Sequence, residues 1–417
     1  MNPRRTLVGL SLCSLLLAGC AGVSTSSGKG GVKVDAGVTD DEIKIGLLNG
    51  YTGPVAAGAI AGAAGFDARL AKANAEGGVC DRDLVSVRAD TKYDPAVAVQ
   101  AYRANVDDIA MIGQLLGATT IFGLSKQIAR DDIATLAATS AASVIPLEDV
   151  YLFTTPFPMY VINGLTWAQQ EFGESGNLKV GVIYQDDDFG EEGLRAAKYA
   201  AEHTDGIDIA AEASYDPTTE DFTAQVLAMK KAGVDMVWVH GIASKTGPIL
   251  SQASQLNFDP QWMTVDSGYD TTLAPQLGNL LDRLHVVTSS VPYSEDVPAM
   301  DEVTKYVEEV APGTKPDQLV VTGWIDASVA VAALERACEK KDLTQKGIVD
   351  AMEGLEISTD GLSPDLSYGS NDDADSRIPS RETRINKVDV DAGVLVPVTE
   401  FGSTPLADEW SLSDDEG

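Results

Sequence analysis

The residues best suited to bind a small molecule lie directly after predicted β-strands. In the first half of the chain they are small or carry a hydroxyl group, so they leave backbone N–H groups accessible. They are Thr52, Gly117, Ala118, Thr119, Thr139 and Ser140. Free N–H groups at the start of a helix attract anions. This half of the chain therefore suits an acceptor group on the ligand, such as a carboxylate.

The second half of the chain places different chemistry at its predicted strand ends. The candidates there are mostly aromatic or acidic: Phe189, His240, Ile242, Asp266 and Tyr269. A carboxylate and aromatic rings favour an ammonium or another polar donor. Together the two sets could hold a zwitterion such as an amino acid. The alternative is structural, because Asp and Thr at strand–helix junctions are commonly helix N-caps.

Catalytic and metal chemistry find little support in the sequence. The chain has three histidines, and we expect only His240, at a strand end, to be able to touch a ligand. Neither a G-x-S-x-G nucleophile motif nor a His-Glu-x-x-His metal motif occurs. We therefore expect a binding protein without a metal or cofactor, and an enzyme is the alternative class.

Strands and helices alternate along most of the chain. Strands are predicted at 43–48, 84–89, 109–112, 133–137 and 150–154, and again at 180–184, 207–212, 236–239, 262–265 and 284–289. Helical patterns separate most of them, which predicts an α/β fold with two doubly wound parallel-sheet lobes. In such sheets ligands bind beyond the carboxyl ends of the strands. From 366 to 401 the pattern favours loops and short strands.

The N-terminus has the features of an export signal. Arg4 and Arg5 precede a short apolar run, which is too short to span a bilayer. The sequence Leu-Ala-Gly-Cys, ending at Cys20, resembles the lipobox of bacterial lipoproteins. That resemblance implies that residues 1–19 are removed and that Cys20 carries a lipid anchor on the outer face of the membrane. An ordinary signal peptide is the alternative, and we expect residues 20–40 to form a flexible tether.

Composition narrows the choice of partners. The net charge of −33 argues against nucleic acid as a partner, because binding to phosphates needs a basic surface.

The acidic end of the chain, 403–417, is expected to be disordered from residue 408 onward. Outside the cell, the remaining cysteines Cys80 and Cys338 are expected to form a disulfide, with two separate buried thiols as the alternative. No segment after the signal is predicted to cross a membrane.

Residues 43–79 resemble the opening of extracellular solute-binding proteins for branched-chain amino acids and related small molecules. The resemblance extends over 41–361 and includes several short motifs in the family's order. They are Thr-Gly-Pro at 52–54, Asn-x-x-Gly-Gly at 74–78, Tyr-Asp-Pro at 93–95, Phe-Gly at 189–190, and Trp-Ile-Asp-Ala at 324–327, where the family usually has Tyr-Asp-Ala.

The resemblance implies a type I periplasmic-binding fold with two lobes, a hinge and a cleft that closes on the ligand. The N-terminal lobe would comprise 41–155 and 285–353, and the C-terminal lobe 156–284 and 354–402. The protein would be a monomer that presents its ligand to an ABC permease. A sensor with the same fold is the alternative.

The family's binding residues transfer only in part. The loops at 117–119 and 139–142 match those that hold the ligand carboxylate, and Asp266 falls near the acid that holds the ammonium. Gly58 and Ile242 replace aromatic residues, and Phe189 replaces a tyrosine. An amino acid is therefore implied, while branched-chain specificity, an amide or another small carboxylate stays open.

Overall fold

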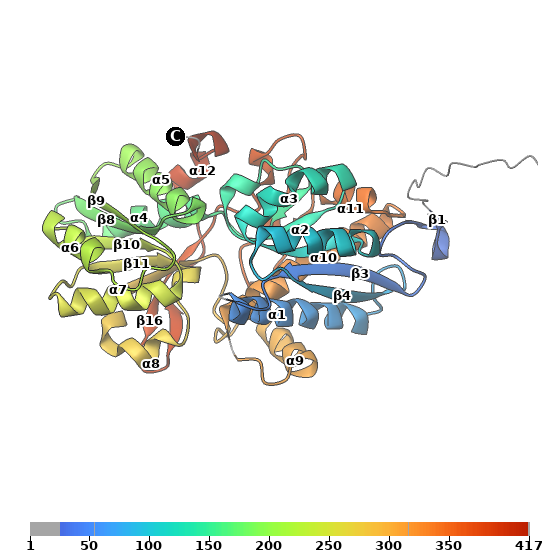
Figure 1. The fold of residues 1–417 in the computed structure, drawn as a ribbon, viewed down its shortest axis with the longest axis horizontal. Helices are drawn as coiled ribbons and strands as arrows, with labels where there is room; N and C mark the ends of the chain where they lie inside the picture. Colours follow the sequence, from blue (N-terminus) through green and yellow to red (C-terminus); the bar gives the residue numbers. More distant parts are fainter. Residues whose placement is uncertain (1–25, 54, 316, 416–417) are drawn as a thin grey trace, which may run out of the picture.

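The computed structural model describes residues 26–53, 55–315 and 317–415. Two α/β lobes lie side by side along its long axis (Figure 1). The N-terminal lobe is built on a five-stranded sheet and the C-terminal lobe on a seven-stranded sheet. The predicted fold class of two parallel-sheet lobes is therefore confirmed.

The N-terminal sheet is parallel throughout and has the order β4-β3-β5-β6-β7. Its strands are β3 (Glu42–Asn49), β4 (Asp83–Asp90), β5 (Met111–Leu116), β6 (Thr135–Ala138) and β7 (Val150–Leu152), and the helices between them are α1 (Ala56–Ala75), α2 (Pro95–Asn105) and α3 (Ala118–Asp131). Ile43, Ile45 and Leu47 of β3 are fully buried. Leu47 and Leu48 are successive residues that point to opposite faces, and both are fully buried, which is typical of a parallel strand that is covered on both faces.

The C-terminal sheet has the order β17-β16-β12-β11-β10-β8-β9. Its strands are β8 (Leu178–Gln185), β9 (Ile207–Tyr215), β10 (Met236–His240), β11 (Gln261–Val265), β12 (Leu284–Thr288), β16 (Arg384–Asp389) and β17 (Val394–Pro397). The helices of this lobe are α4 (Phe157–Phe172), α5 (Asp188–His203), α6 (Thr223–Ala232), α7 (Ala243–Gln255) and α8 (Leu273–Leu277). The antiparallel strands β16 and β17 extend one edge of the parallel sheet.

The chain returns to the N-terminal lobe after β12 through α9 (Met300–Val310), α10 (Gln318–Glu339), α11 (Gln345–Met352), β14 (Glu356–Ile357) and β15 (Leu366–Ser367). Tyr368, just after β15, donates a hydrogen bond to the carbonyl of Leu152 on β7 at 2.6 Å. The lobe boundaries therefore differ from the predicted ones. All of β12 belongs to the C-terminal sheet, and residues 354–378 belong to the N-terminal lobe.

Two features tie the far end of the N-terminal lobe together. A disulfide joins Cys80 to Cys338, with their Cα atoms 5.9 Å apart. The strands β1 (Ser26–Ser27), β2 (Lys33–Val34) and β13 (Asp342–Leu343) form a small sheet, in which Lys33 pairs with Asp342 at 2.9 Å. The described part of the predicted tether, from residue 26 onward, therefore contains regular secondary structure.

The helix α10 is long and apolar enough to cross a membrane, contrary to expectation, but 67% of its apolar window is buried inside the protein. It packs along α1 as the core helix of the N-terminal lobe.

The expectation of a disordered acidic end is wrong for the described residues. The helix α12 (Pro405–Glu409) and the 3-10 helix η7 (Leu412–Asp415) pack on the body of the protein. Trp410 is only 2% exposed and Ala407 is fully buried. Burial of their apolar surface stabilises a segment whose acidic composition alone favours disorder.

Candidate functional site

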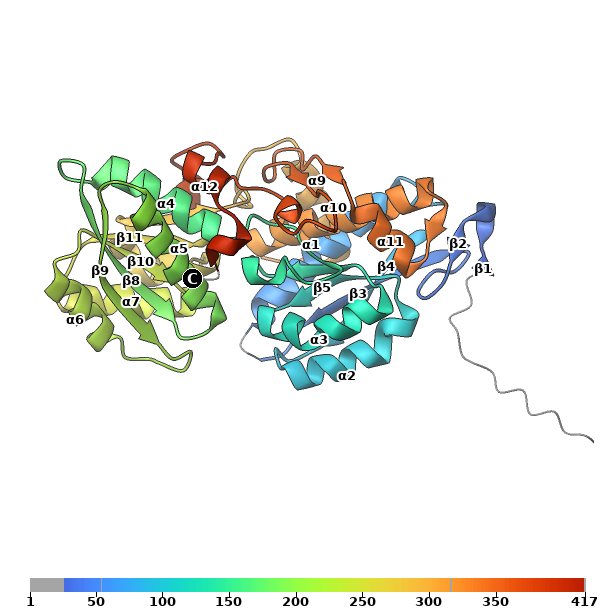
Figure 2. The ribbon, with the colours of Figure 1, turned by 90° about the horizontal axis from the view of Figure 1, so that it is seen from above.

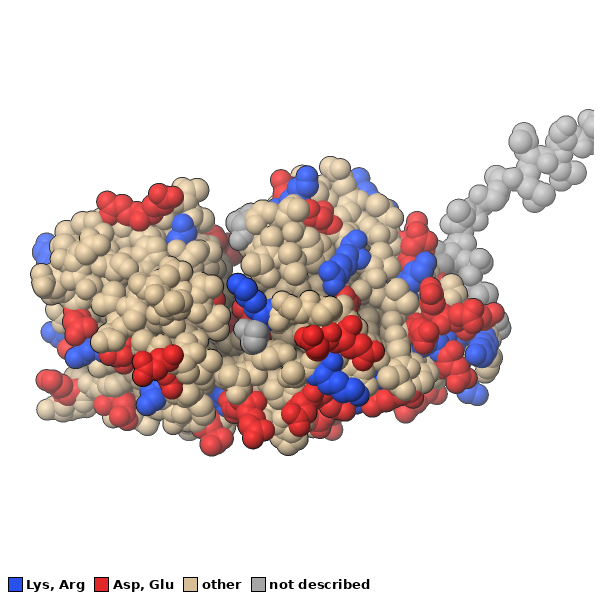
Figure 3. All heavy atoms as spheres, turned by 90° about the horizontal axis from the view of Figure 1, so that it is seen from below, with Lys and Arg blue, Asp and Glu red and all other residues tan. Residues whose placement is uncertain are grey.

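Figure 3 shows a hollow between the two lobes in a space-filling view. Tyr93 of the N-terminal lobe lies beside Gly117. Burial raises the pKa of Tyr93, and the Asp187 carboxylate of the opposite lobe raises it further. The side chain as a whole is 47% exposed, so Tyr93 stands at the rim of the hollow.

The N-terminal wall of the hollow contains the start of α3. Gly117 precedes this helix with φ of +93°, and among the described residues no side chain caps the helix start. A Cβ atom at this position would lie 2.8 Å from the Tyr93 ring, so glycine is required both by conformation and by space. The N–H groups of the first turn, beside the exposed Thr119, can therefore receive an anion.

The other candidates of the N-terminal lobe are partly engaged within the protein. Thr52 donates a hydrogen bond from its hydroxyl to Asp90 at 2.6 Å. Thr139 accepts one from the N–H of Ala141 at 3.2 Å. Ser140 is 8% exposed and shares a 2.8 Å hydrogen bond with Thr154. Thr139 is therefore better placed for a ligand than Ser140, which is buried against the first crossing between the lobes through Thr154.

Asp266 of the C-terminal lobe follows β11 and is held by two neighbours. Its Oδ2 accepts a hydrogen bond from Tyr160 at 2.9 Å, and its Oδ1 accepts one from the N–H of Ser267 at 2.7 Å. Burial raises the pKa of Asp266 to about 6, while these two hydrogen bonds oppose the shift. Although protein surrounds the carboxyl group, the residue keeps part of its surface exposed. Each oxygen therefore retains capacity for one more donor.

His240 does not line the hollow, and its prediction as a ligand contact is corrected. The residue is fully buried, and its ring lies 4.4 Å from that of Phe189. The indole N–H of Trp238 donates to its Nδ1 at 3.2 Å, which assigns the proton to Nε2. Burial lowers the pKa of His240 to about 3, so the ring is neutral. The side chain points under α5, where Gly193 leaves room for it.

The remaining candidates divide between the hollow and a side cavity. Ile242 is 39% exposed and Phe189 is partly buried. Tyr269 is 8% exposed and lines an interlobe cavity of about 60 Å³. The lining of that cavity also includes Tyr293 and Gln318, which belong to no motif in the sequence.

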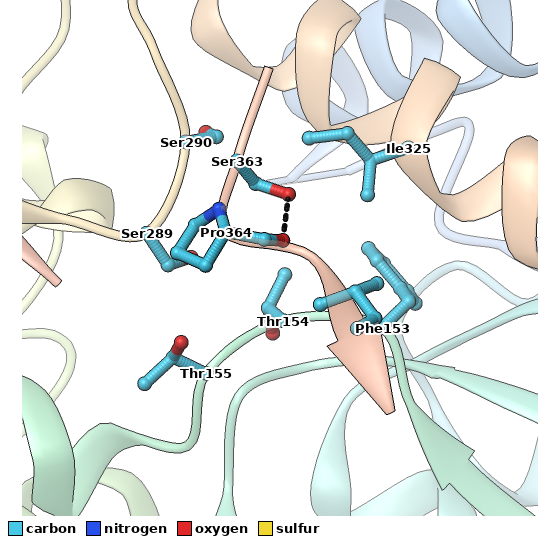
Figure 4. Close-up of a pocket in the computed structure, with 9 residues that line it drawn as sticks. Phe153, Thr154, Thr155, Ser289, Ser290, Ile325, Ser363 and Pro364 are labelled. Carbon is cyan, nitrogen blue, oxygen red and sulfur yellow. Dashed lines mark hydrogen bonds between the residues drawn. The ribbon is translucent and has the colours of Figure 1, made fainter. Parts of the chain in front are cut away.

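A second cavity lies among the segments that cross between the lobes. Figure 4 shows residues of two crossings and of the segment before β15 converging there. Its volume is about 10 Å³, which is room for a single water molecule at most. The hinge is therefore packed. Among the described residues, no group of three or more His, Cys, Asp or Glu side chains could hold a metal ion.

Comparison with known proteins places this geometry in a family. A model described as periplasmic binding protein matches residues 42–391. The chain belongs to this family. The Leu/Ile/Val/Thr-binding protein of Salmonella typhimurium is 26% identical to it over 68% of this chain and 75% of that protein. Homolog 7 of the Leu/Ile/Val-binding proteins in Brucella abortus is 23% identical over 76% of this chain and 82% of that protein.

Solved structures show the same architecture. A fatty acid ABC transporter substrate-binding protein from Thermomonospora curvata has a TM-score of 0.83 and 27% identity, covering 92% of this chain and 98% of that one. A branched-chain amino acid ABC transporter protein from Thermus thermophilus, with bound valine, has a TM-score of 0.77 and 21% identity, covering 88% and 98%. This binding protein is therefore the substrate-binding component of an ABC importer, and it works outside the cytoplasmic membrane.

Proposed function

We propose that this binding protein captures a small carboxylate with an apolar body between its lobes, and that an apolar α-amino acid is the first candidate. The observation that supports this most is that the two lobes offer complementary groups, an uncapped helix start in one and a carboxyl group in the other. The uncapped start of α3 beside Thr119 suits a carboxylate, and Asp266 in the other lobe suits an ammonium group. The relatives named for Leu, Ile, Val and Thr point in the same direction.

Apolar side chains near the hollow support an apolar ligand body. Ile242 is 39% exposed after β10, and Leu319 is 44% exposed at the start of α10. Leu319 lies against Gly58, which stands where an aromatic residue was expected. The missing side chain at Gly58 lets Leu319 pack close to α1.

A carboxylate without an amine is the second candidate. Tyr160 and Ser267 already supply one hydrogen bond to each oxygen of Asp266, so the acid does not require an ammonium partner. The Thermomonospora curvata protein, named for a fatty acid, agrees with this possibility.

Thermal melting of the mature chain tests both candidates. The panel would hold valine, leucine and threonine, their amine-free counterparts such as isovalerate, and octanoate. A ligand that binds only the folded state must raise the melting temperature. Asp266→Asn should weaken an amino acid about 10-fold or more, because a charged hydrogen bond is lost, and should spare amine-free acids. If no compound in the panel shifts the melting temperature, the proposal fails.

The anchor is a separate proposal. We propose that Cys20, which lies outside the described residues, carries a lipid after removal of residues 1–19. The mature protein should then partition into detergent, and Cys20→Ser should release it into the aqueous phase. Unchanged partitioning would contradict the anchor.

We also propose that the protein is a monomer and does not turn over its ligand. Light scattering should give the mass of one chain, and the recovered ligand should be chemically unchanged.

A further inference from the structure

The C-terminal segment 404–415, here called the strap, touches both lobes beside the hinge. Figure 2 shows it in dark red between the lobes, next to α5. It lies after residue 391, where the match to the family model ends. The match to the family model therefore does not account for its contacts.

The first half of the strap is bound to the C-terminal lobe and to a crossing segment. The backbone N–H and the hydroxyl of Thr404 both donate to Asn163 on α4 at 2.9 Å. The guanidinium of Arg381, in the crossing before β16, donates to the carbonyls of Ala407 at 2.8 Å and Trp410 at 2.7 Å. Together with the burial of Trp410, these bonds fix the position of α12.

The second half of the strap bridges the lobes. Asp415 pairs with Arg195 on α5 of the C-terminal lobe at 2.9 Å. The N–H of Leu412 donates to Asp375 at 2.8 Å. Asp375 belongs to the segment that packs on the N-terminal lobe, because the neighbouring Arg377 donates to the carbonyl of Leu147 at 3.1 Å. The short helix η7 therefore contacts both lobes, through Arg195 on one side and Asp375 on the other.

A direct contact between the lobes lies under the strap. Glu192 on α5 is 1% exposed, and its Oε1 accepts hydrogen bonds from the N–H groups of Ala142 at 2.7 Å and Ser143 at 3.3 Å in the N-terminal lobe. Trp410 and Ala142 belong to the same buried apolar cluster, which continues through both lobes. A rotation of one lobe against the other would have to break or slide these contacts.

We propose that the strap is a fourth, non-covalent connection between the lobes that restrains the hinge and so sets how far the empty cleft opens. The three covalent crossings in the described residues pass near 153–156, 289–299 and 379–383. If the strap stabilises one arrangement of the lobes, it lowers the population of the other arrangement. A ligand that binds only that other arrangement then has a lower apparent affinity. The restraint does not depend on the identity of the ligand.

Distances between spin labels on the two lobes test the restraint without a ligand. The labels would be attached after Gln100→Cys on α2 and Lys231→Cys on α6, both at exposed positions away from the strap. Deleting residues 411–417 removes the contacts of Leu412 and Asp415 but keeps α12. Arg195→Gln removes the ion pair to Asp415 from the other side. Glu409→Gln, at an exposed position on α12, is the matched control.

The full chain and the control should give the same narrow distance distribution. The truncated chain should give a broadened or shifted one while it keeps a cooperative melting transition, and Arg195→Gln should change the distribution in the same direction. If the truncated chain fails to fold, Arg195→Gln alone decides. Distributions that match that of the full chain in a folded variant would overturn the proposal.

Discussion

Replacement of Glu192 by glutamine should remove a pH dependence of the free energy of unfolding. Burial raises the pKa of Glu192 to about 8, and the Asp415 carboxylate adds to the rise. The N–H groups of Ala142 and Ser143 and the nearby Arg195 oppose it. Oε2 has no hydrogen-bond partner among the described residues, so no donor stabilises a negative charge on that oxygen.

The sign and size of the effect follow from linkage. The ordinary pKa of a glutamic acid is 4.5, and that of Glu192 in the folded chain is about 8. Between these two pH values the folded chain keeps the proton on Glu192, whereas the unfolded chain has lost it. The free energy of unfolding therefore falls as pH rises through this window. The full shift corresponds to at most about 5 kcal/mol, of which roughly 2 kcal/mol lies between pH 6 and pH 8. Glutamine cannot ionise, so the stability of Glu192→Gln should lack this dependence on pH.

Urea denaturation at pH 6, 7 and 8 measures the difference. The amide resembles the neutral acid, whereas Glu192 of the unfolded native chain is already ionised at pH 6, so the variant should be the more stable by about 2 kcal/mol at pH 6. At pH 8 this difference in the free energy of unfolding should have grown by roughly 2 kcal/mol. Glu191→Gln, an exposed neighbour on the same helix, is the control and should follow the native chain. The reasoning is refuted if the native chain and Glu192→Gln respond to pH alike.

Three other perturbations have defined outcomes. Reduction of the Cys80–Cys338 disulfide, which closes a loop across 258 positions, should lower stability by about 2–4 kcal/mol in urea, and equal midpoints with and without reductant would contradict this. Gly65→Ala should destabilise by about 1–3 kcal/mol, because its Cβ would lie 1.9 Å from the carbonyl oxygen of Val320 and force α1 from α10. Ala118→Pro should keep α3, since proline is accepted at a first helical position, yet weaken carboxylate binding about 10-fold in calorimetry through loss of one N–H donor. Unchanged affinity would remove the α3 start from the site.

The alternation of strands and helices could be predicted because short, mostly apolar strand segments are separated by helical patterns. The apolar run at 43–48 and its counterparts needed no tertiary information. The assignment of β12 to a lobe did need it, since an apolar strand looks the same in either sheet. The ordered C-terminal end was missed because a single tryptophan, Trp410, outweighs the acidic residues around it only once α4 and Arg381 are in place.

The candidate site was predictable where a strand end alone defines it. The glycine before α3 and the acid after β11 follow from chain position and residue type. Tyr160 was missed because its hydrogen bond to Asp266 joins residues 106 positions apart. His240 was misplaced because the last residue of a strand can point under the neighbouring helix as well as into the hollow, and Gly193 decides the direction.

X-ray scattering of the mature chain, free and saturated with the compound that most raises its melting temperature, tests most directly whether the ligand binds between the lobes. Capture of the ligand between the lobes predicts a smaller radius of gyration on saturation, because the lobes close on the ligand. Ala118→Pro at the same subsaturating ligand concentration should contract less. An unchanged radius of gyration at proven saturation, in both proteins, would contradict capture of the ligand by closure of the two lobes.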